Sequence, residues 1–196
     1  MLWLNAMSNE KRTYTKRARA EAQDETRRRI AAATAELHST VGPAQTTVAE
    51  IARRAGVQRA TVYANFPEET ELFRACQAHF LGENPPPDLV PPFALSDPRE
   101  RLEAVLRLLY AWYRRTRGMS ANVRRHRDAV PALDALLRDS VDARMAALAD
   151  ALAPGGGDRR ALAAVAVDFW TWHRLAEEGL DDDAAAALMT RAVVAA

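Results

Sequence analysis

The sequence predicts an all-α protein. Apolar residues recur three and four positions apart through almost the whole of the 196-residue chain, which is the spacing of amphipathic helices. No stretch alternates convincingly between apolar and polar residues, as a half-buried strand would. Hydrophobic residues make up 48% of the chain and charged residues 27%, so we expect a globular rather than a disordered protein.

Capping signals delimit the helices of the N-terminal part. An apolar stripe over residues 30–41 predicts a helix that ends at the Gly-Pro pair following it. Thr47 and Glu50 have the spacing of a capping box, which predicts the start of a short second helix. Gly56 is able to adopt φ > 0 and to end that helix, and residues 58–64 then have room for about two further turns.

Longer helices are predicted in the C-terminal part. Apolar stripes over residues 102–113 and 133–152 each predict one helix, and a third is predicted over residues 158–178, with Gly179 as its terminal glycine. The three aspartates at 181–183 predict the start of the last helix, because carboxylates stabilise the positive end of a helix dipole.

Charge is unevenly distributed along the chain. Residues 1–66 contain 11 Lys and Arg against 6 Asp and Glu, whereas residues 67–196 contain 16 against 20. The single cysteine, Cys76, excludes an intramolecular disulfide and a cysteine cage for a metal, which fits a cytoplasmic protein. No apolar run approaches the roughly 20 residues of a membrane span, and residues 1–6 are too short for a signal peptide, so we expect no membrane partner.

The basic part of the chain contains a helix-turn-helix pattern. A capped helix, a glycine turn and a short helix with polar outer residues form the arrangement that places its second helix in a DNA major groove. Gln58 and Arg59 lie at the start of that helix, where glutamine pairs with adenine and arginine with guanine. Thr61 and Tyr63 are either further contacts or partly buried residues. The alternative for Gln58 and Arg59 is a solvated surface, which the surrounding motif disfavours.

Residues 26–75 resemble the DNA-binding domain of the TetR family of transcriptional regulators. The resemblance rests on the Thr-Thr pair at 46–47, the Ile-Ala-x-x-Ala-Gly-Val pattern at 51–57, the Thr-x-Tyr-x-x-Phe pattern at 61–66, and Leu72. It implies that Thr47 caps the second helix near a phosphate. It also implies that Gln58, Arg59 and Thr61 face the groove and that Tyr63 contacts a backbone phosphate.

The sequence departs from this pattern at the start of the fourth helix. Glu69 stands where the family commonly has a lysine that meets phosphate, and Glu68 and Glu71 flank it. Carboxylates suit a helix N-terminus but repel phosphate. We therefore expect phosphate attraction to come from the basic residues near the N-terminus, which are Lys11, Arg12, Lys16, Arg17 and Arg19, with Arg27 and Arg28.

The resemblance also implies how the chain is divided. Residues 1–22 are expected to form a flexible basic arm and residues 23–82 a three-helix, helix-turn-helix DNA-binding domain. Residues 83–97 are expected to be a proline-rich junction, because five prolines within 82–93 exclude a continuous helix. Residues 98–196 are expected to form a helical domain that binds a small-molecule effector and dimerises through its last two helices.

Bulky side chains on the C-terminal helices are candidates for the effector site, although residues at helical spacing are more often core. The candidates are Trp112, Tyr113, Met119, Phe169, Trp172 and His173. An anion site at Arg124, Arg125 and His126 is also considered, but a solvated helix face is the preferred interpretation of these three. Val165, Phe169, Leu188 and Val193 are candidates for a self-complementary dimer face.

By this resemblance we expect a homodimeric repressor that leaves a palindromic operator in double-stranded DNA when a small molecule binds. An activator of the same fold, or a regulator that responds to a partner protein, is the alternative. A small all-α enzyme or ligand carrier is a more remote one. No residue pattern typical of catalysis is evident, and the histidines do not fall at metal-ligand spacing, so we expect no enzyme, metal or cofactor.

Overall fold

The structure, a computed structural model, describes the backbone of residues 2–196 and the side chains of residues 16–196. It is helical throughout, and no strand occurs among the described residues, as the sequence predicts. The N-terminal helices are α1 (Leu2–Thr40), α2 (Val48–Ala55), α3 (Arg59–Asn65) and α4 (Glu69–Glu83). The C-terminal helices are α5 (Val90–Phe93), α6 (Pro98–Arg115), α7 (Arg117–His126), α8 (Pro131–Leu137), α9 (Ala143–Leu152), α10 (Gly157–Val167), α11 (Phe169–Glu177) and α12 (Asp182–Ala195).

Three short elements complete the chain. Residues Pro43–Gln45 and Arg127–Ala129 form single 3-10 turns, and Arg138–Asp142 form a π-helical turn between α8 and α9. The first helix begins at Leu2 and therefore includes most of the expected N-terminal arm. The flexibility of that arm stays a prediction.

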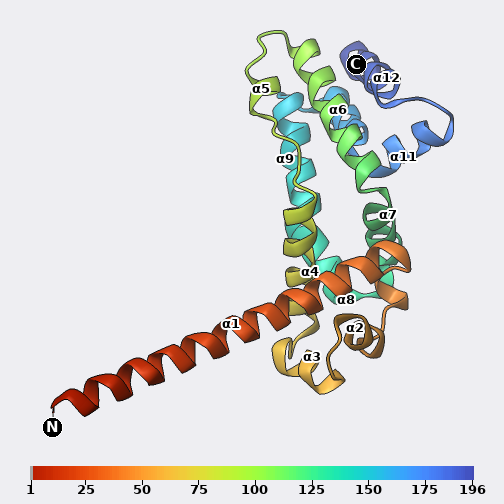
Figure 1. Cartoon of the computed structure of the whole chain (residues 1–196). Helices are drawn as coiled ribbons and strands as arrows, with labels where there is room; N and C mark the ends of the chain where they lie inside the picture. Colours follow the sequence, from red (N-terminus) through yellow and green to blue (C-terminus); the bar gives the residue numbers. More distant parts are fainter. Residues whose placement is uncertain (1) are drawn as a thin grey trace.

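The second half of α1 packs with α2 and α3 around a small apolar core at one end of the molecule (Figure 1). The buried side chains of this core include Ile30, Leu37, Ile51, Val62 and Phe66. The caps of α2 are close to those predicted. The Glu50 N–H donates to Thr47 Oγ1 at 3.2 Å, and Gly56 ends the helix in the left-handed conformation, with φ of 66°. The Glu50 carboxylate pairs with Arg53, so only half of the capping box forms.

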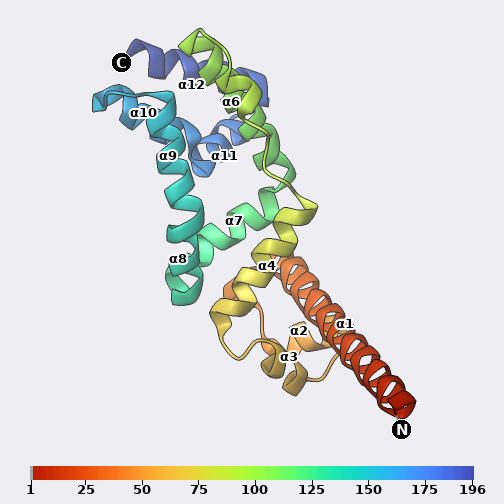
Figure 2. The same cartoon turned by 90° about the vertical axis from the view of Figure 1, so that its left-hand side faces the viewer.

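Two helix contacts join the N-terminal core to the rest of the molecule. The last turns of α1 pack on α7, and α4 extends from the N-terminal core to pack against α8 (Figure 2). Gly118 of α7 lies so close to α1 that an added Cβ atom would be 2.9 Å from the Ser39 carbonyl oxygen. The Asn122 amide donates to the carbonyls of His38 and Ser39 at 3.0 and 3.1 Å. The end of α1 is therefore fixed to α7 through its backbone.

The expected proline-rich junction contains one short helix. Within it, α5 places Pro91 in its first turn, where a missing N–H donor costs no intrahelical hydrogen bond. The Trp112 indole N–H on α6 donates to the carbonyl of Asn84, directly after α4, at 3.1 Å. Asp97 caps α6 by accepting from the Arg99 N–H at 2.8 Å. Both ends of the junction are therefore bound to α6.

A larger apolar core lies among α6, α9, α10, α11 and α12. Its most buried members include Leu102, Leu106, Tyr110, Phe169, Trp172 and Val193. The last helix begins as predicted, with Asp181 accepting from the Ala184 N–H at 2.8 Å, and Gly179 has the expected positive φ, 89°.

The prediction of a single helix over residues 158–178 is wrong, because α10 and α11 occupy this range. The chain breaks at Asp168, which is extended and caps α11 by accepting from the Trp170 N–H at 2.8 Å. The break leaves carbonyls at the end of α10 without helical partners. Buried tyrosine hydroxyls of α6 satisfy them, because Tyr110 donates to Ala166 and Tyr113 to Val167, each at 2.7 Å.

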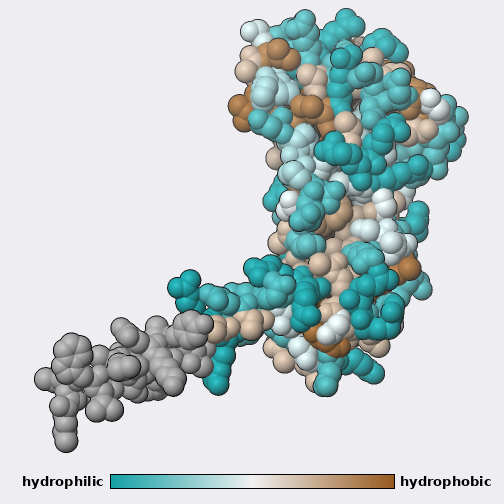
Figure 3. All heavy atoms as spheres, in the orientation of Figure 1, coloured by the Kyte–Doolittle hydropathy of each residue, from teal (hydrophilic) through white to brown (hydrophobic). Residues whose placement is uncertain are grey.

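No helix of the described residues combines the length and apolar character that crossing a membrane requires. In the view of Figure 3, hydrophilic residues cover most of the surface at both ends of the molecule, and less polar residues show at the waist between them.

Replacing Tyr110 with phenylalanine should destabilise the protein. The Ala166 carbonyl would stay buried without its hydroxyl donor, so we expect the free energy of unfolding to fall by about 1 to 3 kcal/mol. Urea denaturation followed by circular dichroism measures the change. Tyr63→Phe is the matched control, because the Tyr63 side chain is 53% exposed, and it should leave stability unchanged. Equal stability of Tyr110→Phe and the native protein would contradict this account of the helix break.

Candidate nucleic-acid interface and effector cavity

The short helix α3 presents polar side chains at its start. Gln58 is its N-cap residue, has extended backbone angles and makes no capping hydrogen bond with its side chain. Gln58 and Arg59 are both exposed, whereas Val62, one turn further along the helix, is buried in the N-terminal core. The inner face thus fixes the helix while the outer side chains remain available for base edges, as major-groove recognition requires.

The other predicted DNA-binding residues near α3 are also accessible. Tyr63 lies one turn after Arg59 and is exposed, so both side chains lie on one face of α3. Thr61 is half-buried. Thr47 is exposed and uses its hydroxyl oxygen to cap α2, which leaves the hydroxyl proton available for a phosphate. Their contacts with DNA stay predictions.

Four of the basic residues expected to attract phosphate differ in their surroundings. Arg27 donates to the carbonyl of Asn65, the last residue of α3, and its guanidinium carbon lies 4.2 Å from the centre of the Phe66 ring. Arg27 therefore stabilises the C-terminal end of α3. Arg17 and Arg28 are exposed and pair with glutamates on α1, at 2.8 and 2.5 Å, and Lys16 is exposed.

The acidic residues at the start of α4 lie close to this face. Glu68 is the N-cap residue of α4, and Glu69 and Glu71 lie in its first turn. All three are exposed, and Glu69 lines the same surface hollow as Tyr63. The carboxylates stabilise the helix dipole and lower the electrostatic attraction for phosphate beside α3.

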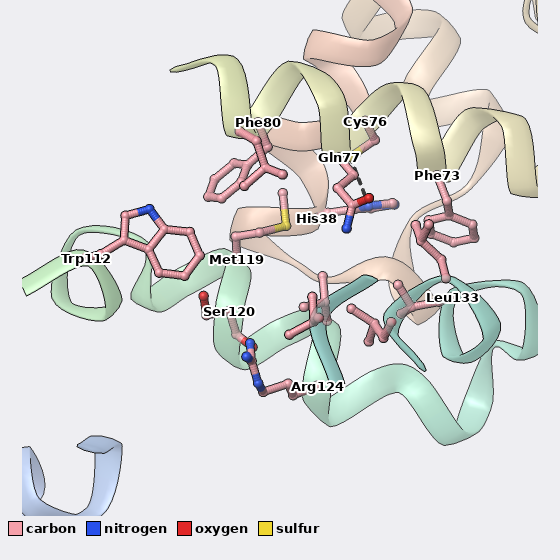
Figure 4. Close-up of a pocket in the computed structure, with 15 residues that line it drawn as sticks. His38, Phe73, Cys76, Gln77, Phe80, Trp112, Met119, Ser120, Arg124 and Leu133 are labelled. Carbon is pink, nitrogen blue, oxygen red and sulfur yellow. Dashed lines mark hydrogen bonds between the residues drawn. The ribbon is translucent and has the colours of Figure 1, made fainter. Parts of the chain in front are cut away.

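Two adjoining cavities lie between the N-terminal and C-terminal cores. The smaller, of about 90 Å³, is enclosed by α1, α4, α6, α7 and α8 and is shown in Figure 4. The larger, of about 420 Å³, lies among α4, α5, α6 and α9 and has the size of a small-molecule site. The two share the lining residues Gln77, Leu81, Trp112, Arg124 and Val141.

The structure brings together only part of the predicted effector site. Trp112 lines both cavities, Met119 lines the smaller one and Tyr113 the larger one. Phe169 and Trp172 are buried in the C-terminal core, and His173 is beside Glu177 at 3.7 Å; these three line neither cavity.

The candidate effector site also includes side chains of α4, which the sequence did not predict. Phe73, Cys76, Gln77 and Phe80 all line the smaller cavity (Figure 4). Their spacing of three and four is the signal that would have found them, but it equally describes a helix packed only on the N-terminal core.

The polar groups around the smaller cavity are mostly uncharged. Burial, with a smaller effect of His126, lowers the pKa of His38 to about 4, and burial raises the pKa of the Cys76 thiol to about 12. Cys76 Sγ lies 3.6 Å from His38 Nδ1. The pair is therefore neutral near pH 7 and contributes polarity rather than charge to the cavity.

Of the three residues considered as an anion site, only Arg124 lines the cavities. It is partly buried, and burial lowers the pKa of its guanidinium group. The interpretation as a solvated face is wrong for Arg124, because Tyr113 and Phe169 cover its side chain. Arg125 is exposed, as that interpretation requires. No group of acidic, histidine or cysteine side chains suited to a metal occurs in the part of the chain that the structure describes.

This architecture defines a class of protein. A helix-turn-helix with an exposed second helix, joined through α4 to a larger helical part, is the architecture of a DNA-binding regulator. Residues 30–76 match the family model of the bacterial regulatory proteins of the tetR family. This match places residues 30–76 among the DNA-binding domains of the TetR family of transcriptional regulators, as the resemblance of residues 26–75 predicts.

Solved structures share the fold over most of the chain. One is a Clostridium perfringens protein proposed as a fatty acid metabolism regulator, with 20% identity and a TM-score of 0.61 over 84% of this chain and 96% of that chain. Another is a Rhodococcus sp. protein proposed as a TetR-family transcriptional regulator, with 17% identity and a TM-score of 0.61 over 88% and 98% of the two chains. No protein of curated function matches the chain in sequence.

Replacing Arg27 with glutamine should lower stability. The substitution removes the charged hydrogen bond to the Asn65 carbonyl and the contact with Phe66, so we expect a loss of about 1 to 2 kcal/mol in the free energy of unfolding. Urea denaturation checks it. Arg28→Gln is the control, because the Arg28–Glu25 pair is exposed, and it should change stability by less than about 0.5 kcal/mol. If both variants are equally stable, Arg27 is a surface cation like its neighbour.

Proposed function

We propose that the protein is a homodimeric repressor that binds a palindromic operator and leaves it when a small molecule occupies the cavities. One observation carries this proposal. The helix α4 directly follows the recognition helix α3 and also supplies Phe73, Cys76, Gln77 and Phe80 to the smaller cavity. An occupant of the cavity would therefore contact the helix that supports the DNA-binding end.

The proposed mechanism is a shift of population between two arrangements of the dimer. The recognition helices of a dimer bind successive major grooves only when their separation is close to one turn of DNA, about 34 Å. An effector that binds better to an arrangement with another separation draws the protein away from DNA. The size of the response is limited by the difference between the effector's affinities for the two arrangements.

The C-terminal helices offer a surface for the second subunit. Val165 on α10 and both Leu188 and Val194 on α12 are exposed apolar residues, and α10 and α12 pack against each other. Small alanines such as Ala161 and Ala184 are exposed beside them and would let the helices of two subunits approach closely. The predicted face needs a correction at Phe169 and Val193, which are fully buried within their own subunit.

Two-fold symmetry links the dimer to the operator. A dimer with one recognition helix per subunit reads two identical half-sites, so its operator is palindromic. An activator of the same fold, or a regulator answering to a partner protein, would use the same DNA face. Transcription from a promoter containing the operator, with and without small molecules, separates these alternatives from a repressor.

Selection of duplexes from a random DNA pool by the purified protein should yield a two-fold symmetric sequence with steeply salt-dependent affinity. Arg59→Ala should weaken binding to this sequence by about 1 to 3 kcal/mol per contacted base pair and relax the preference at that position. Lys16→Gln combined with Arg17→Gln should instead weaken binding to all sequences and flatten the salt dependence. Fluorescence anisotropy over a salt series measures both effects. Weak binding without sequence preference by a folded dimer would overturn the proposal.

Leu188→Glu should dissociate the dimer. The substitution places a charge in the proposed apolar interface of both subunits, so we expect the dimer dissociation constant to rise by about a hundredfold or more. Sedimentation equilibrium measures it. Val90→Glu is the matched control, since Val90 is 77% exposed on α5, outside the proposed interface, and this variant should remain dimeric. Loss of the dimer in Val90→Glu alone would contradict the proposed interface on α10 and α12.

A further inference from the structure

The side chain of Arg124 packs against two neighbouring aromatic rings. Its guanidinium carbon lies 4.9 Å from the centre of the Phe169 ring and 5.9 Å from that of Tyr113. Its Nη1 donates to the Ser120 carbonyl at 3.2 Å, which uses one of the five guanidinium N–H donors. The two rings pack against the guanidinium group, and this hydrogen bond leaves four of its N–H donors for other partners.

Arg124 lacks the counterion that a partly buried cation ordinarily has. Among the described residues, no carboxylate oxygen lies within 4.0 Å of its nitrogen atoms. Arg127, one turn further along the chain, shows the usual arrangement, because Asp134 and Asp142 pair with it at 2.7 and 2.8 Å. Asp168 and Asp142 act on Arg124 only from a greater distance. A desolvated charge without a carboxylate in contact is unfavourable, and an anion brought to it recovers part of that free energy.

Arg124 lies at the wall of two cavities that are lined mainly by apolar side chains. It lines both cavities, together with Leu81, Trp112 and Val141. In Figure 4, Arg124 lies beside Ser120 at the edge of the smaller cavity, and Met119, Trp112 and Phe80 gather above it. The larger cavity continues from the same residues toward Leu89, Phe93, Met145 and Leu148. A molecule seated here would have one end at a cation and the rest of its length against hydrocarbon and aromatic groups.

We propose that the effector is an amphipathic monocarboxylate whose carboxylate binds Arg124 and whose apolar part fills the larger cavity. The proposal rests on the proposed function, because it names the chemistry of the molecule that the cavities receive. A planar carboxylate matches the paired donors of a guanidinium group. A single negative charge matches a single partly buried cation, since Arg144, the other cation of the larger cavity, is exposed.

The position of the carboxylate also connects the ligand to α4. Gln77 and Leu81 of α4 line both cavities with Arg124. Gln77 donates to Ser140 Oγ at 3.0 Å, in the π-helical turn between α8 and α9. A ligand bound to Arg124 therefore lies against the contact that holds α4 to the C-terminal helices.

Isothermal titration calorimetry of the full chain without DNA tests the proposal with two matched pairs of probes. Decanoate is compared with decanol, and phenylbutyrate with phenylbutanol, all below their aggregation concentrations. We expect at least one carboxylate to bind about tenfold or more tightly than its alcohol, because the alcohol cannot form the ionic pair. Arg124→Met should remove this preference while leaving the affinity for the alcohol unchanged. Arg125→Met and Arg144→Met, at exposed arginines, should retain it.

Several results would overturn the proposal. The first is equal binding of acid and alcohol by the native protein, and the second is an unchanged preference for the acid in Arg124→Met. The third is loss of this preference in Arg144→Met alone, and the fourth is no binding of any carboxylate probe. Arg124→Lys provides a second variant should Arg124→Met fold poorly, and the comparison of acid with alcohol needs no variant. DNA affinity is measured separately. If alcohols release the protein from its operator, the proposed function holds and only the proposed carboxylate chemistry of the effector is wrong.

Discussion

The contact between the end of α1 and α7 fixes the DNA-binding end to the rest of the molecule. A helix end normally leaves its last carbonyls without partners, and here the Asn122 amide bonds two of them, those of His38 and Ser39. Gly118 permits this approach, since any side chain at its position would press on the Ser39 carbonyl. The joint is made by backbone atoms and one amide, so α1 and α7 have little freedom to move separately. The helix α4 is the second connection, and it makes its contacts through side chains around the cavities.

The sequence predicts the N-terminal end of the fold well because its signals are local. Thr47 and Gly56 act on groups within a few residues of themselves, and both take their predicted roles at the ends of α2. The break at Asp168 escapes prediction because its stabilising partners, Tyr110 and Tyr113, are more than fifty residues away on α6. Arg124 escapes for the same reason: its burial depends on Phe169 of α11, and a neighbouring arginine on the same helix is exposed.

The basic character of the N-terminal part serves more than one purpose. Arg27 closes the end of the recognition helix, and Arg54 pairs with Glu36 across α2 and α1. These charges therefore stabilise the three-helix core, whereas Arg59 is directed outward. A count of charges overstates the number of cations available to DNA, and the carboxylates at the start of α4 reduce the attraction further. In the proposed binding, contacts of α3 with base edges therefore contribute more of the affinity, relative to phosphate contacts, than the number of basic residues suggests.

Trp112 joins two parts of the molecule that the proposed mechanism requires to act together. Its ring lines both cavities while its indole N–H is bonded to the carbonyl that follows α4. Indole emission responds to both the polarity around the ring and the hydrogen bond at its nitrogen. Trp112 is thus an intrinsic fluorescent probe at the boundary between the cavities and the DNA-binding end. Its emission would respond both to a molecule that enters the cavities and to a displacement of α4.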